Sequence, residues 1–380
     1  MSQLLKTILL ITSLTIAFMN PSYSKTFVYV SSADDADIGT YEMLASGELV
    51  VGPRVKAAPL VMPMAINPKN KLLYAASRSK PFTVFVYQIN PYNGVLTPFD
   101  SSPLAESFPF ISLDNTGRHL FGAGYGSSLV SVNAVGADGR VAPTPTQIVP
   151  IGRNSHSVRV DATNQYLFVP SLGSDQVFQF KFNAADGRLS SNTPAVFLAQ
   201  AGTGPRHFVF SPDNKFVYLL SELVGTITTF SLDAKTGLLS QLSVDSVLPP
   251  SSSDLRPGAP RGPVGVAGAP VRNVEKDIWA ADVHITPNGK FLIASERTNS
   301  TLTVFGVDTQ NGKITQTASV QTEKQPRGFA VDPSGEFVVA TGELSSTISV
   351  YKLDQKLGSL SLIGKYPTGK SSSWVEMITF

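Results

Sequence analysis

Short runs of alternating apolar and polar residues, joined in pairs by tight turns, recur along the chain. The clearest is GPRHFVFSPDNKFVYLLSE at 204–222, where an apolar run over 208–210 meets a Ser-Pro-Asp-Asn turn and a second run covers 216–220. Alternation with a period of two predicts a β-hairpin. Because paired strands of a hairpin are antiparallel, Arg206 before the first run and Glu222 after the second should emerge at the same edge of the sheet.

The same hairpin occurs six times. Aligned on the residue before the turn, the repeats are marked by Asn67, Asp114, Asp161, Ser211, Thr286 and Asp332. The steps between these marks are 47, 47, 50, 75 and 46 residues. A later glycine-containing turn accompanies the repeats at Gly47, Gly94, Gly139, Gly187, Gly237, Gly312 and Gly358. A period in the high forties that is built from short strands predicts the blades of a propeller.

The two ends of the chain supply the strands of a seventh hairpin. There are seven glycine turns but six complete hairpins; residues 27–30 match a second strand without its first, and 374–380 match a first strand without its second. Pairing them would remove the free sheet edges of a linear array. We therefore predict an all-β fold, a seven-bladed β-propeller of four-stranded antiparallel blades, closed by pairing of the N- and C-terminal strands.

Two segments stand outside the repeats. Residues 1–24 combine Lys6, a short apolar stretch and small residues at Ser22 and Ser24, which is typical of a cleaved secretory signal peptide. We expect residues 25–380 to form one propeller domain, periplasmic or secreted, without a membrane span after cleavage. The long fourth step contains a Pro/Gly-rich insertion at 249–275. It should be a loop that reaches the face carrying Arg206, either as a plain surface loop or as a lid.

Composition narrows the function classes. The chain has no cysteine, a formal net charge of +2 and four histidines without metal-ligand spacing. Disulfides, thiolate metal sites and a nucleic-acid-binding basic stripe are therefore not expected. The sequence gives no reason to expect a metal or another cofactor, and we expect a monomer.

Charged residues recur at two places in the repeat. The positions five residues before and eleven residues after each mark should lie on one face of the disc, around the central channel. They are Met62, Pro109, His156, Arg206, Ala281 and Arg327, and Arg78, Tyr125, Leu172, Glu222, Arg297 and Glu343. Single Arg–Glu pairs at strand ends are commonly ordinary surface pairs. Several arginines around one opening, however, indicate a site for a small anionic ligand, because guanidinium binds carboxylate or phosphate with two parallel hydrogen bonds.

The other histidines are assigned no chemistry. His207 and His284 fall inside inner strands and should be hydrogen-bonded packing residues, whereas His119 should be exposed. His156 is therefore the histidine that we expect at the opening of the central channel, among the arginines.

With these residues in view, the chain resembles the seven-bladed propeller lactonase family, which includes 6-phosphogluconolactonases and carboxy-cis,cis-muconate lactonizing enzymes. The resemblance covers residues 26–380. Its most specific motifs are HSVRVDATNQYLFVP, GPRHFVFSPDNKFVYLLSE, WAADVHITPNGKFLIASERT and QPRGFAVDPSGEFVVATGE. It implies chemistry at His156, Arg206, Glu222 and Arg297. The signal peptide and the insertion depart from the family pattern, and export makes a phosphorylated metabolic intermediate an unexpected substrate.

The resemblance implies an exported lactonase that hydrolyses a sugar-acid or carboxylated lactone. We expect Arg206 to stabilise the oxyanion, Arg297 and Arg327 to bind the anionic group, and Arg78, Tyr125 and Glu343 to complete the substrate side. Either His156 or Glu222 would be the general base; a carboxylate between arginines has a low pKa, which favours His156. Two alternatives stay open: a non-enzymatic propeller that binds a carboxylated glycan or a protein, and a cycloisomerase of an unsaturated dicarboxylate.

Overall fold

The computed structural model describes residues 24–261 and 273–380. The expected signal peptide lies outside the described residues except for Ser24, and so does the part of the insertion at 262–272. No helix within the described ranges is both long and apolar enough to cross a bilayer.

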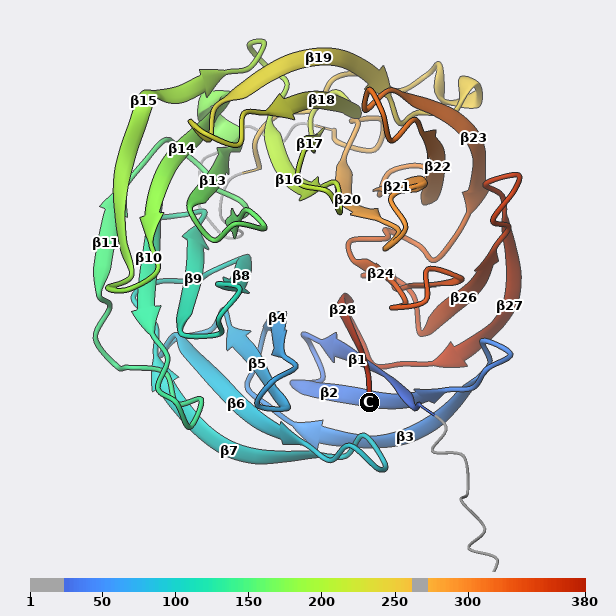
Figure 1. The fold of residues 1–380 in the computed structure, drawn as a ribbon. Coiled ribbons are helices and arrows are strands. Elements are labelled where there is room, and N and C mark those ends of the chain that lie inside the picture. Colours follow the sequence, from blue (N-terminus) through green and yellow to red (C-terminus); the bar gives the residue numbers. More distant parts are fainter. Residues whose placement is uncertain (1–23, 262–272) are drawn as a thin grey trace, which may run out of the picture.

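Seven four-stranded antiparallel sheets form a closed ring, as predicted (Figure 1). From the innermost strand outward, the blade made from both ends of the chain consists of β28 (Ser372–Thr379), β1 (Thr26–Ser32), β2 (Asp37–Met43) and β3 (Leu49–Lys56). The next two are β4 (Val61–Asn67), β5 (Leu72–Ser77), β6 (Thr83–Ile89) and β7 (Leu96–Pro103), and β8 (Phe110–Leu113), β9 (His119–Gly124), β10 (Leu129–Ala134) and β11 (Gln147–Pro150).

The remaining four blades follow in the same order. They are β12 (Arg159–Val160), β13 (Tyr166–Ser171), β14 (Gln176–Asn183) and β15 (Arg188–Leu198); β16 (Pro205–Phe210), β17 (Phe216–Ser221), β18 (Thr226–Leu232) and β19 (Leu239–Ser246); β20 (Ala280–Ile285), β21 (Phe291–Glu296), β22 (Thr301–Val307) and β23 (Ile314–Gln321); and β24 (Phe329–Val331), β25 (Phe337–Ala340), β26 (Thr347–Leu353) and β27 (Leu360–Pro367). Within the described residues, two short 3-10 helices, η1 (Leu172–Ser174) and η2 (Pro250–Ser252), lie in connections.

The C-terminal strand closes the ring. β28 pairs antiparallel with β1, from Thr26 opposite Thr379 to Ser31 opposite Trp374. The two strands lie side by side at the inner end of their blade (Figure 1). This confirms the predicted closure.

The repeated turns have a local chemical cause. In the hairpin of β12 and β13, the Asp161 carboxylate accepts hydrogen bonds from the backbone N–H groups of Thr163, Gln165 and Tyr166 at 2.9–3.1 Å. A short polar side chain at this mark therefore holds the turn, as expected for an Asx-type turn.

The glycine-containing turns that recur in the blades need glycine for two reasons: there is no room for a Cβ atom, and φ is positive. Gly187 has φ +75°, and a Cβ there would come within 2.6 Å of His119. His119 is buried and stands edge-on to Phe182, so the expectation that it is exposed is wrong. The turn of the neighbouring blade covers it, a contact between blades that the pattern within one strand does not reveal.

Neighbouring blades are also tied by buried tyrosines. The hydroxyls of Tyr29, Tyr74 and Tyr166 donate to backbone carbonyls in the glycine turn of the next blade, at 2.9, 2.8 and 2.6 Å. Between these ties, apolar side chains fill the space between sheets. Packed aromatic and aliphatic cores of this kind supply most of the stability of a chain without disulfides.

The inner strands begin with irregular pairing where they approach the channel. The register shifts between Pro205 and His207 in β16, and between Ala280 and Val283 in β20. A bulge breaks the strict alternation of faces, so adjacent residues can both serve the channel side. Arg206 and His207 are such a pair, and both make contacts with groups around the channel.

Candidate active site

A buried Arg–Glu–Arg cluster occupies the mouth, the face of the disc where the inner strands begin. Arg206 at the start of β16 donates from Nε to Glu222 Oε2 at 2.6 Å, and Arg297, just after β21, donates from Nη2 to the same oxygen at 3.0 Å. The predicted meeting of Arg206 and Glu222 at one sheet edge is confirmed. Their side chains are at most 5% exposed. Arg206 also donates to the Ala281 carbonyl.

The cluster keeps a net positive charge. Burial alone would raise the pKa of Glu222, but Arg297 and Arg206 outweigh this and lower it, so the carboxylate stays ionised. Burial lowers the pKa of Arg206 to about 10, which leaves it cationic at neutral pH. Two guanidinium groups thus share one carboxylate, and the surplus charge favours an anion or a developing oxyanion.

His156 lies beside this cluster as an uncharged imidazole. Its ring is edge-on to Tyr125 and His207, with centroids 5.6 and 5.0 Å away. Burial, assisted by Arg206, lowers its pKa well below the usual value. Among the described residues its buried Nδ1 has no hydrogen-bond partner, and no bond links it to Glu222. Glu222 hydrogen-bonds to the two arginines instead.

A second histidine belongs to the site, and sequence reasoning missed it. His207 Nδ1 lies 2.8 Å from Asp282 Oδ1, and Asp282 Oδ2 lies 3.1 Å from His284 Nε2. Burial would raise the pKa of Asp282, but His284 and His207 hold it well below its usual range, so the carboxylate accepts from both rings. His207 is hydrogen-bonded, as expected, yet its Nε2 is buried without a partner in the described structure.

The remaining predicted residues form a more open rim. Arg327 Nη1 lies 3.7 Å from Glu343 Oε1, with both side chains partly exposed. Arg78 donates to Ser107, and burial together with the positive charge of Arg327 lowers its pKa to about 10. Burial raises the pKa of Tyr125 to about 12, with the Glu222 carboxylate adding to the effect. The charges of the predicted catalytic residues and of the predicted substrate-binding residues therefore act on one another.

The described part of the insertion crosses this face. Residues 256–261, which we call the crossing segment, leave the end of the blade of β16–β19; the Gly258 N–H donates to the Leu223 carbonyl at 2.7 Å. At its end the Arg261 carbonyl accepts from the Tyr125 hydroxyl at 3.0 Å, two blades away. The insertion thus reaches the face that carries Arg206, as predicted.

Trp279 connects the crossing segment to the buried cluster. The guanidinium groups of Arg261 and Arg297 lie 3.2 and 3.6 Å from its ring centroid. At these distances two planar cations cannot share one face, so the indole lies between them. Cation–π contact on both sides holds Arg297 in place and covers it.

Three buried polar atoms of the cluster and its two neighbouring histidines lack partners within the described residues: Arg206 Nη2, His156 Nδ1 and His207 Nε2. Buried groups of this kind are rare unless a ligand or water completes them. The guanidinium of Arg206 can stabilise negative charge. The ring nitrogens of the two neutral imidazoles can accept protons. No group of three or more potential metal-ligating side chains occurs in 24–261 or 273–380.

Comparison with known proteins adds independent findings. The family described as "Lactonase, 7-bladed beta-propeller" matches residues 25–377. A 6-phosphogluconolactonase of Pectobacterium carotovorum is 35% identical, covering 92% of this chain and 98% of its own length. One of Serratia proteamaculans is 34% identical, covering 93% and 99%.

Solved structures agree with the fold. A periplasmic gluconolactonase of Pseudomonas aeruginosa superposes with a TM-score of 0.78 at 26% identity, covering 93% of this chain and 99% of its own. A protein from Lactobacillus plantarum has a TM-score of 0.79 at 23% identity, with coverage of 93% and 99%, which supports the fold alone.

Proposed function

The chain belongs to the seven-bladed β-propeller lactonase family and is a lactone hydrolase, and from this premise we propose that it is exported and opens a sugar-acid or carboxylated lactone at the mouth of its channel. The observation that carries the location is the buried cluster of Arg206, Glu222 and Arg297 beside two uncharged histidines with unpartnered ring nitrogens.

His156 is the proposed general base. As a neutral imidazole it removes a proton from a water molecule while the water oxygen attacks the ring carbonyl carbon. The carbonyl oxygen becomes an oxyanion, stabilised by Arg206 through its unpartnered Nη2. When the ring C–O bond breaks, the proton on His156 passes to the leaving oxygen, and a hydroxy acid results.

His207 supports this proton transfer. Because its Nδ1 hydrogen is held by Asp282, its buried Nε2 carries a free lone pair, and its ring lies 5.0 Å from that of His156. The Asp282 carboxylate stabilises positive charge that develops on the imidazole pair. In this proposal Glu222 neutralises and orients Arg206 and Arg297, and takes no proton.

Substrate binding falls to the rim. Arg327, Arg78 and Tyr125 surround the opening, with Glu343 available to accept hydrogen bonds from hydroxyl groups. The gluconolactonase of P. aeruginosa is periplasmic by name, and residues 1–24 read as a secretion signal. Both support export, and an exported enzyme favours an unphosphorylated aldonolactone over a phosphorylated one.

A substrate panel tests the proposal. Purified protein is given glucono-δ-lactone, galactono-γ-lactone, 6-phosphogluconolactone and cis,cis-muconate, and acid release or ring closure is followed. Hydrolysis of an aldonolactone that His156→Ala abolishes supports the proposal. Cyclisation of muconate without lactone hydrolysis establishes the cycloisomerase. No turnover, with retained binding of a carboxylated glycan, establishes the binding propeller.

A further inference from the structure

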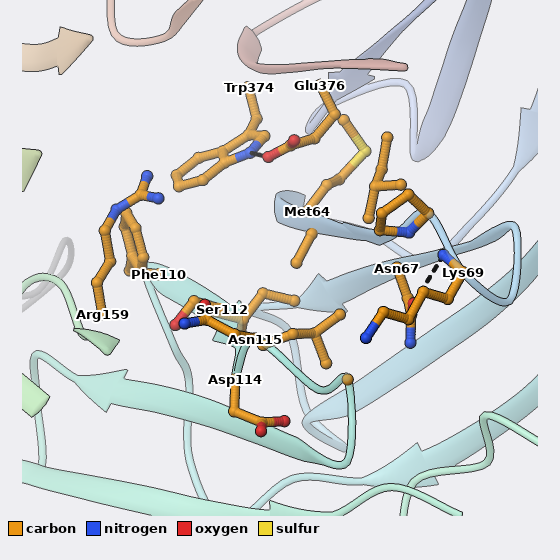
Figure 2. A pocket seen from close by; sticks show the side chains of 16 residues that line it. Met64, Asn67, Lys69, Phe110, Ser112, Asp114, Asn115, Arg159, Trp374 and Glu376 are labelled. Carbon is orange, nitrogen blue, oxygen red and sulfur yellow. Dashed lines mark hydrogen bonds between the residues drawn. The ribbon is translucent and has the colours of Figure 1, made fainter. Parts of the chain in front are cut away.

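Two adjoining cavities lie at the end of the channel opposite the mouth. Their volumes are about 370 and 450 Å³. They are lined by the later residues of inner strands and by hairpin turns, whereas the mouth cluster lies at the strand starts. Both are bounded by Ser112, Leu113, Asn115, Arg159 and Glu376. We call the two together the turn-end chamber; Figure 2 shows the first of them.

Two cations, Arg159 and Lys69, line this chamber. Lys69 is exposed, whereas Arg159 is partly buried and has no acidic partner at contact distance within the described residues. Its guanidinium stacks on the Phe110 ring at 5.0 Å and points toward Trp374 (Figure 2). Within the described ranges it forms no ion pair, and its buried Nε has no hydrogen-bond partner. A partly buried guanidinium without an acidic partner is available to pair with an anionic ligand.

Glu376 stands across the chamber. Its Oε1 accepts from Trp374 Nε1 at 2.9 Å. Burial raises its pKa to about 7; the Trp374 bond, Arg159 and His284 lower it, and Asp282 adds to the rise. Below about pH 7 the side chain is therefore mainly an uncharged acid, able to donate a hydrogen bond.

The other polar groups of the wall are already used by the fold. The Ser112 hydroxyl donates to the Val158 carbonyl at 2.7 Å, and the Asn115 amide donates to the Asp161 carbonyl at 2.9 Å. The Asp114 carboxylate accepts backbone N–H groups of its own turn. Arg159, Glu376 and the exposed Lys69 are thus the charged or ionisable groups left to recognise a ligand, beside the aromatic faces of Trp374 and Phe110.

We propose that the turn-end chamber is a second binding site, distinct from the mouth, for a small hydroxylated carboxylate, whose carboxylate pairs with the Arg159 guanidinium and whose hydroxyl groups bond to Glu376. The volume suits a small molecule. One guanidinium matches one carboxylate, and aromatic walls suit the C–H face of a polyol chain. A phosphate dianion would lack a second buried cation, and Asp282 lies nearby. The proposal does not rest on lactone hydrolysis at the mouth.

Calorimetric titration with gluconate at pH 6 tests the charge recognition. Wild type is expected to bind gluconate but not glucose, which lacks the carboxylate. Arg159→Gln should weaken binding about tenfold or more, because charge-assisted hydrogen bonds are lost. Arg188→Gln, at an exposed arginine of β15 with no side-chain partner in the described structure, should bind as wild type. Lactone turnover should be unchanged in Arg159→Gln, which also shows that the variant is folded.

The pH dependence gives a second, independent readout. Affinity of wild type should fall several-fold between pH 6 and 8, as Glu376 ionises and repels the carboxylate. Glu376→Gln mimics the protonated form and should bind equally at both pH values. The proposal is overturned if Arg159→Gln binds gluconate like wild type, or if the pH effect persists in Glu376→Gln.

Discussion

At the scale of single residues, burial sets the protonation states that the mouth needs. Arg206 is almost inaccessible, and desolvation together with its positive charge lowers the pKa of both His156 and His207 and keeps them neutral. Burial, assisted by Arg206, lowers the pKa of His207 to about 3, even though Asp282 opposes the shift. Uncharged imidazoles beside cations are available as proton acceptors across the neutral range.

This predicts an unusual pH profile. The kcat/KM for a lactone should stay constant from pH 8 down to about pH 5, because protonation of either histidine begins only well below its ordinary pKa. A proton-release assay corrected for spontaneous hydrolysis measures it. Loss of half the activity near pH 6.5 would show that the base titrates like an exposed histidine and would contradict the assignment.

At the same scale, sequence reasoning reached some residues and missed others. The eight predicted positions follow from equivalent places in the repeat, and their hydrogen bonds, ring contact and electrostatic influence on one another show that they lie near each other. The pair of His207 and Asp282 was missed because strict alternation points a residue next to Arg206 away from the same site. The bulges in β16 and β20 overturn that rule, and a bulge leaves no clear mark in a single sequence.

At the scale of elements, Trp279 and the crossing segment hold the mouth together. The indole separates the guanidinium groups of Arg261 and Arg297, and the Arg261 carbonyl is tied to Tyr125. Composition predicted a loop here and the strand order predicted the face it reaches. Its path to Tyr125 depends on tertiary contacts, which a segment rich in proline and glycine does not encode locally.

Replacing Trp279 with leucine should lower kcat/KM about tenfold. A desolvated cation–π contact is worth roughly 1–2 kcal/mol, and its loss frees Arg297 from its position. Steady-state kinetics with the best lactone measures the change. Tyr92→Leu, at a tyrosine that is 81% exposed, is the control and should behave as wild type. Equal kinetics for both variants would show that the indole does not position Arg297.

At the scale of the whole molecule, closure by β28 makes a linear array of repeats into a ring. The period of the marks and the half-hairpins at the two ends were sufficient to predict seven blades and their closure. The contacts between blades were not predictable in the same way. The burial of His119 under the turn at Gly187 is an example, because it joins segments that only the folded ring brings together.

Deleting residues 372–380 should abolish cooperative folding. The deletion exposes the inner edge of β1 and removes Trp374 and Val375 from the core, a loss comparable to the roughly 5–15 kcal/mol that stabilises a typical domain. Thermal unfolding followed by circular dichroism measures this. Leu357→Ser, at a leucine that is 70% exposed, should keep the wild-type Tm. A cooperative transition of the truncated chain near that Tm would show that the ring does not depend on its closing strand.

The central claim is that lactone hydrolysis takes place at the buried mouth cluster. Its most direct test is the kcat/KM for glucono-δ-lactone in Arg206→Gln and in the matched surface variant Arg188→Gln, with folding checked by Tm. The account predicts a loss of about 10²–10³ for Arg206→Gln, the usual effect of removing an oxyanion donor, and no change for Arg188→Gln. A folded Arg206→Gln enzyme that keeps wild-type kcat/KM would place the chemistry elsewhere.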